Sequence, residues 1–224
     1  MSKKKKILVI TGIEFEQKTL LDRDVISGFG YGKRKSNIAV RKYINSKPDC
    51  IVSFGFAGST SEKINCGDII IPDKIISQSG KINLTSKKYR EYFKKKLSNY
   101  SCCTSKLFSS DQLINTPQKK EIILKKFGAL AVDMETSSIQ NEAKKKRIPF
   151  VCIRVILDNK KSHVPKEFGY FFSEDSKIIK AKVLKLILTK PWIIYSFIRM
   201  SFYFFKSLVV LRGVSKKVFD KRSF

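Results

Sequence analysis

Histidine is nearly absent from this sequence of 224 residues: His163 is the only one, and the five cysteines form no CxxC pair. Zinc sites take three or four His, Cys or acidic ligands at characteristic spacings, so we expect no metal site. The odd number of cysteines, three of them in apolar runs, favours a reducing compartment over a disulfide framework. Only Ile7 to Ile10 form an apolar run near the N-terminus, so we expect no secretory signal and a cytoplasmic protein.

Acidic residues are also scarce, with 19 Asp and Glu against 46 Lys and Arg and a net charge of +27. A basic surface attracts nucleic acid whatever the fold. However, only 9 of the 46 basic residues are Arg, the side chain that suits bidentate recognition of bases and phosphates. The lysines extend from Lys3 to Lys221 in runs with few aromatics among them. This distribution is typical of a solvated surface, and we expect no nucleic-acid partner.

Length and composition predict one domain, because 224 residues with 42% hydrophobic content are sufficient for one full core. Apolar runs cover residues 7–11, 50–54, 68–72 and 150–157, and amphipathic segments cover 33–46, 117–127 and 135–147. The runs are typical of strands buried on both faces, and the segments between them of helices. The alternation predicts an α/β fold with a central mixed, mostly parallel sheet flanked by helices. We place a catalytic domain at residues 1–185 and a basic, aromatic-rich helical extension at 186–224.

Two long segments carry a resemblance to a known family. Residues 51–76, IVSFGFAGSTSEKINCGDIIIPDKII, run from a strand through a GxAG turn to GD and a second apolar strand. Residues 129–158, ALAVDMETSSIQNEAKKKRIPFVCIRVILD, contain an apolar strand, DME, a helix, PF and RxxxD. With SSDQLIN at 109–115 and TGIEFE at 11–16, the chain resembles the purine nucleoside phosphorylase and methylthioadenosine nucleosidase family over residues 7–165. The resemblance implies that family's fold and cleavage of the N-glycosidic bond of a purine nucleoside, with adenine as the expected base.

This reaction needs an acid for the leaving base, a site for the sugar and a nucleophile, because its transition state is oxocarbenium-like. Asp158 ends an apolar strand, where loss of hydration raises the pKa of a carboxyl group and lets it carry a proton. In its RxxxD context we predict that Asp158 is the general acid that protonates purine N7. Without that motif, an aspartate in a turn or helix cap before Asn159 would be the simpler interpretation.

The DME motif predicts the sugar site. Glu135 follows the apolar run at 129–132, and a carboxylate there can accept hydrogen bonds from both ribose hydroxyls. The same residue would also suit the first turn of a helix. The resemblance places Met134 against the ribose, although core packing would explain a methionine as well. Arg154 lies inside a strand and needs a carboxylate partner, either Glu135 or Asp133. We assign Met134, Glu135 and Arg154 to substrate binding.

The nucleophile is water or phosphate. The resemblance makes Glu16 the glutamate that activates water in nucleosidases of the family, with Glu14 as the alternative if the loop shifts in register. Purine phosphorylases have an arginine where this chain has Ser53, and that difference argues against phosphorolysis. The glycine-rich stretch that contains Lys33 and Arg34 offers a second possible anion site at a helix start, or simply a tight turn.

The base pocket is predicted from two short segments. Leu113 and Ile114 fall where the family places residues that contact the base, and Ala57 and Gly58 line the same pocket by resemblance. Aliphatic side chains suit the face of a purine, whereas the family often has an aromatic residue at the position of Leu113. Core residues at a strand end are the alternative interpretation.

Within the family, SFGFAG, GDIIIP and VDMET most resemble the hopanoid-associated phosphorylase branch. Members of that branch are linked to removing adenine from adenosylhopane, so a lipid-linked nucleoside is among the expected substrates. The resemblance implies no metal or organic cofactor, and a homo-oligomer.

The C-terminal segment 191–211 is dense in aromatic residues but contains Arg199 and Lys206. Each cation would cost about 2.5–3.5 kcal/mol near a bilayer centre, which disfavours a membrane span. On a helix, Ser196, Arg199, Tyr203 and Lys206 share one face and leave a wide apolar face with a basic edge, as in helices that lie on membranes. The segment therefore predicts peripheral membrane contact or packing on protein. A basic membrane-surface or nucleic-acid-binding protein without catalytic activity is the alternative class.

Overall fold

The computed structural model describes residues 5–162, 189 and 194–220. The strands are β1 (Ile7–Thr11), β2 (Ile26–Phe29), β3 (Cys50–Ser59), β4 (Ile69–Ile70), β5 (Lys74–Ser77), β6 (Ile82–Leu84), β7 (Cys102–Cys103), β8 (Lys106–Ser109), β9 (Ala129–Asp133) and β10 (Phe150–Asp158). The helices are α1 (Glu14–Lys18), α2 (Gly32–Tyr43), a 3-10 turn (Ile44–Ser46), α3 (Lys87–Lys96), α4 (Pro117–Phe127), α5 (Thr136–Lys145) and α7 (Ile194–Val218).

All these strands form one sheet in the order β6-β5-β8-β9-β3-β10-β4-β7, with β1 beside β3 and β2 beside β1. Strands β1, β2, β3 and β10 pair in parallel, whereas β4 pairs antiparallel to β10 and β9 antiparallel to the end of β3. The expected α/β fold, with a mixed and mostly parallel sheet flanked by helices, is confirmed.

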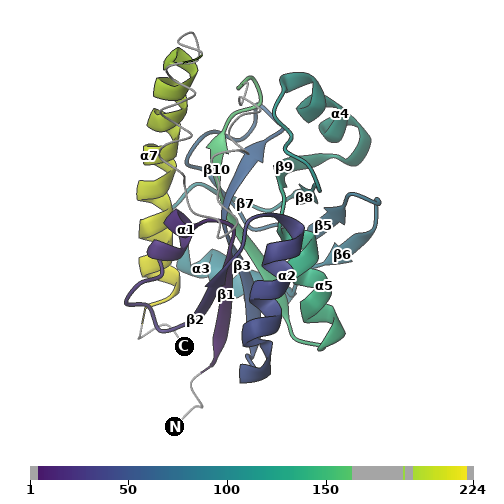
Figure 1. Ribbon diagram of the computed structural model, residues 1–224, viewed down its shortest axis with the longest axis vertical. Helices are drawn as coiled ribbons and strands as arrows, with labels where there is room; N and C mark the ends of the chain where they lie inside the picture. The colour runs from purple at the N-terminus through teal and green to yellow at the C-terminus, as the bar shows by residue number, and fades with distance from the viewer. Residues whose placement is uncertain (1–4, 163–188, 190–193, 221–224) are drawn as a thin grey trace.

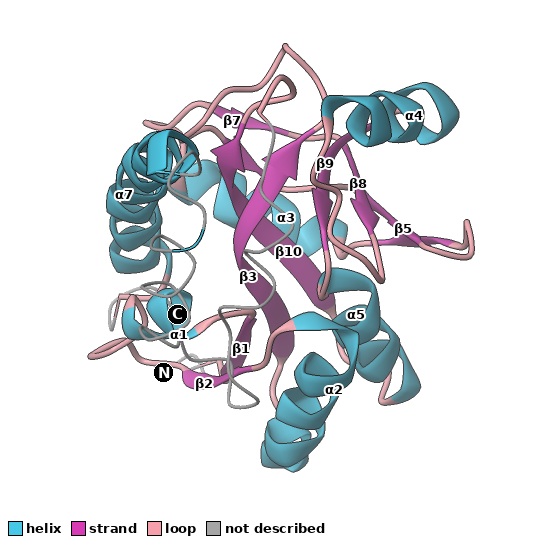
Figure 2. Ribbon diagram, turned by 45° about the horizontal axis from the view of Figure 1, so that its top comes forward, coloured by secondary structure: helices cyan, strands magenta, loops and turns pink. Residues whose placement is uncertain are grey.

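The central strands are apolar throughout because helices cover both faces of the sheet (Figure 1, Figure 2). Along β1, Ile7 and Val9 pack into one hydrophobic core, and Leu8 and Ile10 pack into the other. The first core is completed by side chains of α3 and α7, and the second by side chains of α2 and α5. Strands β3 and β10 alternate between the two cores in the same way.

Two strands differ in length from the sequence expectation. The run at 68–72 forms only the two-residue strand β4, because Gly67 turns the chain at φ +95° and Pro72 has no N–H for a ladder. Conversely, β3 continues past Phe54 to Ser59, pairing first with β1 and β10 and then with β9.

Helix α7 contains most of the predicted C-terminal segment and extends beyond it to Val218, while residues 191–193 and the boundary at 185 lie outside the described residues. Its inner face belongs to the first core, where Leu208, Leu211, Val214 and Val218 are buried. Burying an aliphatic side chain contributes about 1.5–3 kcal/mol, so this helix is a substantial part of the fold. Within the described ranges, no helix is long and apolar enough to span a membrane.

Candidate active site

A cavity of about 180 Å³ lies where β1, β3, β9 and β10 end. Ligands of open α/β sheets bind at such strand ends. The lining includes eight of the nine residues assigned from the sequence: Glu16, Ala57, Gly58, Leu113, Ile114, Met134, Glu135 and Asp158. The ninth, Arg154, is not part of the lining. Chain segments more than 140 residues apart in sequence thus meet at one cavity.

Glu16 lies in α1 with its carboxylate turned into the protein. Its Oε2 accepts hydrogen bonds from the backbone N–H groups of Gly12 (2.6 Å) and Ile13 (3.0 Å), and its Oε1 accepts one from Phe56 (2.7 Å). Burial raises the pKa of Glu16 above its ordinary value, whereas Arg154 and the three N–H donors act to lower it. The donors favour the ionised form, which is the form that can accept a proton.

The first loop brings Glu16 to the cavity rather than Glu14. Glu14 pairs with Lys18 on the surface of α1, with 3.0 Å between Oε1 and Nζ. Gly55 makes room for the buried carboxylate, because a methyl group at this position would lie 2.3 Å from Glu16 Oε1. Its φ of +155° is also one that residues with a side chain rarely adopt.

Glu135 is the residue immediately before α5, and its Oε1 accepts a hydrogen bond from Gly32 N–H at the start of α2 (2.9 Å). The glycine-rich stretch therefore directs its first helical N–H to a carboxylate of the protein. Burial, followed by the charge of Asp133, raises the pKa of Glu135 to about 7. A methyl group at Gly12 would lie 3.2 Å from Glu135 Cδ and 3.3 Å from Glu16 Oε2. The carboxyl groups of Glu16 and Glu135 therefore both lie next to Gly12 in the cavity wall.

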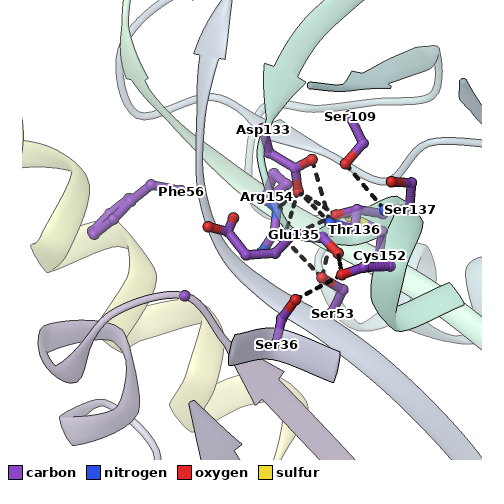
Figure 3. Close-up of polar contacts among 12 residues, drawn as sticks. Ser36, Ser53, Phe56, Ser109, Asp133, Glu135, Thr136, Ser137, Cys152 and Arg154 are labelled. Atoms are coloured by element: carbon purple, nitrogen blue, oxygen red, sulfur yellow. Dashed lines mark hydrogen bonds and ion pairs between the residues drawn. The ribbon is translucent and has the colours of Figure 1, made fainter. Parts of the chain in front are cut away.

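Arg154 lies beneath this wall and is 1% exposed. Its Nε donates to Asp133 Oδ2 (3.0 Å), and its Nη2 donates to the same oxygen (2.6 Å), to Ser53 Oγ (2.7 Å) and to Thr136 Oγ1 (2.9 Å) (Figure 3). Of the two carboxylates that the sequence left open as partners of Arg154, Asp133 rather than Glu135 forms the ion pair. The guanidinium also acts to lower the pKa of both cavity glutamates, although burial has the larger effect. Contact between Arg154 and a substrate stays a prediction.

Asp158 ends β10, and its Oδ2 forms a buried ion pair with Lys120 Nζ. The same ammonium donates to the Asn159 carbonyl (2.8 Å), and Lys120 is 1% exposed. Burial raises the pKa of Asp158, and Lys120 acts to lower it. The second carboxylate oxygen approaches the backbone of β3, where a methyl group at Gly58 would lie 2.8 Å from Asp158 Oδ1. Lys120 therefore holds one oxygen while the other remains on the cavity side.

Several cavity residues were not assigned from the sequence: Tyr31, Phe56, Gln112, Leu157 and Met200. Tyr31 lies in the glycine-rich stretch, and its hydroxyl donates to Met134 Sδ (3.6 Å). Burial, and then Glu135, raises the pKa of Tyr31 to about 12, so its hydroxyl remains a donor at neutral pH. Met200 comes from α7, and no sequence pattern connects that helix with the cavity.

A cavity lined by buried carboxylates at the strand ends of an α/β sheet defines a small-molecule site of enzyme type. The chain belongs to the phosphorylase superfamily, because residues 9–190 match the sequence model of that family. It is 26% identical over 202 residues to the 5′-methylthioadenosine/S-adenosylhomocysteine nucleosidase of Staphylococcus aureus, an alignment that covers 79% of this chain and 89% of that protein.

Solved structures share the fold at lower identity. An Asp-to-Asn variant of the Helicobacter pylori methylthioadenosine nucleosidase, with 5′-methylthioadenosine in its active site, has a TM-score of 0.68 and 17% identity and covers 83% of this chain and 99% of that chain. The futalosine hydrolase of Helicobacter pylori has a TM-score of 0.67 and 19% identity and covers 83% of this chain and 98% of that one.

Proposed function

We propose that this protein hydrolyses the N-glycosidic bond of an adenine nucleoside. The observation that carries the proposal is the convergence of three buried carboxylates, Glu16, Glu135 and Asp158, on one cavity, in addition to Asp133, which is paired with Arg154. Hydrolytic cleavage of a glycosidic bond needs an acid, a base and a group that holds the sugar. The relatives support the same chemistry, since they are named as nucleosidases and a futalosine hydrolase.

We assign one role to each carboxylate, and the surroundings of each support its role. Water attacks C1′ of the ribose while the C1′–N9 bond breaks, and Glu16 accepts the proton that the water loses. Asp158 delivers a proton to N7, so that the base leaves as neutral adenine. Glu135 accepts hydrogen bonds from the ribose hydroxyls and holds C1′ between the other two groups. The aliphatic side chains of Leu113 and Ile114 contact the base.

Water is favoured over phosphate as the nucleophile. Among the described residues that line the cavity there is no Lys or Arg, whereas a phosphate dianion needs cationic or N–H donors around it. Lys33 instead pairs with Asp111 (3.1 Å between Nζ and Oδ2), and Gly32 N–H is bonded to Glu135. Ser53, at the position of the phosphorylase arginine, accepts a hydrogen bond from buried Arg154.

The group at the ribose 5′ position decides which nucleoside is the substrate. The relatives are named for a methylthio group, a homocysteine and futalosine, and the hopanoid-associated resemblance adds an apolar lipid. Phe56, Met200 and Leu157 give the cavity an apolar section that favours an apolar 5′ substituent. A homo-oligomer, implied by the resemblance, stays a prediction.

Adenine release tests the proposal. Adenosine, methylthioadenosine and an adenosyl-lipid are each incubated with the protein, with and without phosphate, and base and sugar products are quantified. We expect adenine and the free sugar, at a rate that phosphate does not change, and a loss of about 10²-fold or more in Glu16→Gln. Glu14→Gln is the matched control and is expected to retain activity, because Glu14 pairs with Lys18 on the surface of α1. A sugar 1-phosphate product would contradict hydrolysis, and no release from any of the three would contradict adenine cleavage.

The pair between Lys120 and Asp158 predicts a shift in the pH dependence of this reaction. A general acid works while it is protonated, so activity falls as the pH rises through its pKa. Because Lys120 lowers the pKa of Asp158, Lys120→Met is expected to move the alkaline limb of kcat/KM to higher pH. Lys120→Arg keeps the charge and is expected to keep the alkaline limb of kcat/KM at the wild-type pH. Lys119→Met, at the exposed neighbouring position, is expected to do the same. An unchanged alkaline limb in Lys120→Met would exclude an influence of Lys120 on the pKa of the general acid.

A further inference from the structure

Helix α7 has a second apolar face that points away from the protein. Ile198, Phe202, Phe205 and Val209 are 64–68% exposed, although each is a large hydrophobic side chain. Their spacing of four, three and four residues places them in one stripe along the helix, about 16 Å long at 1.5 Å per residue. The helix lies along one side of the molecule, so this stripe faces outward (Figure 1, Figure 2). An apolar patch of this kind marks an interaction surface.

The charges of α7 are all of one sign. Between Ile194 and Val218 the helix contains no Asp or Glu. Its basic residues Arg199, Lys206, Arg212, Lys216 and Lys217 are all exposed. At 100° per residue, Arg199, Lys206 and Lys217 flank the stripe on one side, and Lys216 continues it toward the C-terminal end. The exposed face is therefore apolar along its centre and cationic at its edge and end.

We propose that this face of α7 docks on an anionic lipid surface, with the helix lying in the plane of the interface. Helices that bind in this way combine an apolar stripe with Lys and Arg beside it, and each basic residue near the surface adds attraction to anionic headgroups. A second copy of the chain fits this face less well, because α7 has no acidic side chain to pair with a partner's lysines and both copies carry a net charge of +27.

The same helix also forms part of the cavity wall. Met200 lines the cavity from the buried side of α7. Phe204 contacts Phe56 of the cavity lining, with 5.6 Å between ring centroids, and Phe15 of α1 at 5.4 Å. A protein docked through α7 would therefore hold the cavity next to the lipid surface. The docking itself does not depend on the activity proposed above, because its evidence is the outer face of the helix alone.

Vesicle cosedimentation of the full chain tests the proposal. One set of vesicles is pure phosphatidylcholine, and the other contains equal parts of phosphatidylcholine and phosphatidylglycerol. We expect binding to the anionic vesicles, weakened by salt, and little binding to the neutral ones. Phe202→Ser combined with Phe205→Ser is expected to weaken anionic binding at least about tenfold, because two aromatic side chains no longer enter the interface.

Leu84→Ser combined with Ile122→Ser is the matched control. These residues are 72% and 61% exposed and lie on β6 and α4, so their loss is expected to leave vesicle binding unchanged. Both double variants change exposed side chains, and equal unfolding midpoints would verify their folds. Absence of binding to anionic vesicles, or equal binding by the phenylalanine variant and wild type, would overturn the proposal. A wild-type dimer in sedimentation equilibrium that dissociates in the phenylalanine variant, but not in the control variant, would also overturn the proposal. A second copy of the chain would then cover this face.

Discussion

Asp158→Asn is expected to lower kcat for adenine release by about 10²–10⁴-fold while nucleoside still binds. An amide keeps the shape of the carboxyl group but cannot deliver a proton to N7. We expect the variant to keep the close approach of the side chain to Gly58 while losing its transferable proton and its negative charge. Steady-state kinetics together with the dissociation constant of the nucleoside, measured by calorimetry, would separate a lost proton donor from a lost binding site.

The buried neighbour of Asp158 requires a second variant. Asparagine leaves the ammonium of Lys120 without its counter-charge, and an unpaired buried charge destabilises a fold. Asp158→Asn combined with Lys120→Met removes both charges and is expected to be as inactive as the single variant but more stable. Asp111→Asn, which breaks an exposed pair with Lys33, is the matched control for activity. An Asp158→Asn protein with wild-type kcat would exclude Asp158 as the acid.

Arg154→Met is expected to destabilise the protein by about 3–5 kcal/mol, because it leaves the Asp133 carboxylate buried without a cation. Ser53 and Thr136 also lose the donor that joins β3, β10 and α5 (Figure 3). For a chain of this size the change corresponds to a fall in Tm of roughly 6–20 °C, measurable by calorimetry. Adding Asp133→Asn to Arg154→Met is expected to recover part of the stability.

Arg41→Met is the matched control for this substitution. Arg41 forms an ion pair with Glu142 at 3.1 Å, but its side chain is 63% exposed. The exposed Arg41 side chain is hydrated and Glu142 keeps a second partner in Lys145 at 2.6 Å, so the Tm of Arg41→Met is expected to change little. If Arg154→Met and Arg41→Met lower Tm by the same small amount, the buried pair between Arg154 and Asp133 does not stabilise the fold more than the pair of Arg41 does.

Sequence reasoning predicted the centre of the sheet well because both faces of those strands are buried. Strand β1 is apolar up to its last residue, and β10 is apolar apart from Arg154 and the terminal Asp158, so both runs are visible without knowing their neighbours. Helix α3, KKYREYFKKK, was not predicted, because Tyr89 and Phe93 are its only buried side chains among the lysines. Strand β6, at the edge of the sheet, is partly exposed, and pairing with β5 rather than its own pattern determines it.

The cavity residues also divide into those that a local sequence pattern indicates and those that only tertiary contacts bring to the site. Glu16, Glu135 and Asp158 stand in motifs and could be selected from the sequence, whereas Lys120 could not. Lys120 is one of several lysines in α4, and burial distinguishes it from Lys119 and Lys125. That burial depends on the approach of the end of β10 to the first turn of α4, a tertiary contact to which no local pattern corresponds.

The acidic lining of the cavity has a consequence for selection among metabolites. A protein with a net charge of +27 attracts free nucleotides to its surface, and these share their base and sugar with nucleosides. A 5′-phosphate, however, would enter the apolar section of Phe56, Leu157 and Met200, in the same cavity as the buried carboxylates Glu16 and Glu135, where like charges repel each other. Like-charge repulsion excludes a wrong ligand without weakening the right one. If the cavity binds adenine nucleosides as proposed, we expect it to favour an uncharged nucleoside over the corresponding nucleotide by charge.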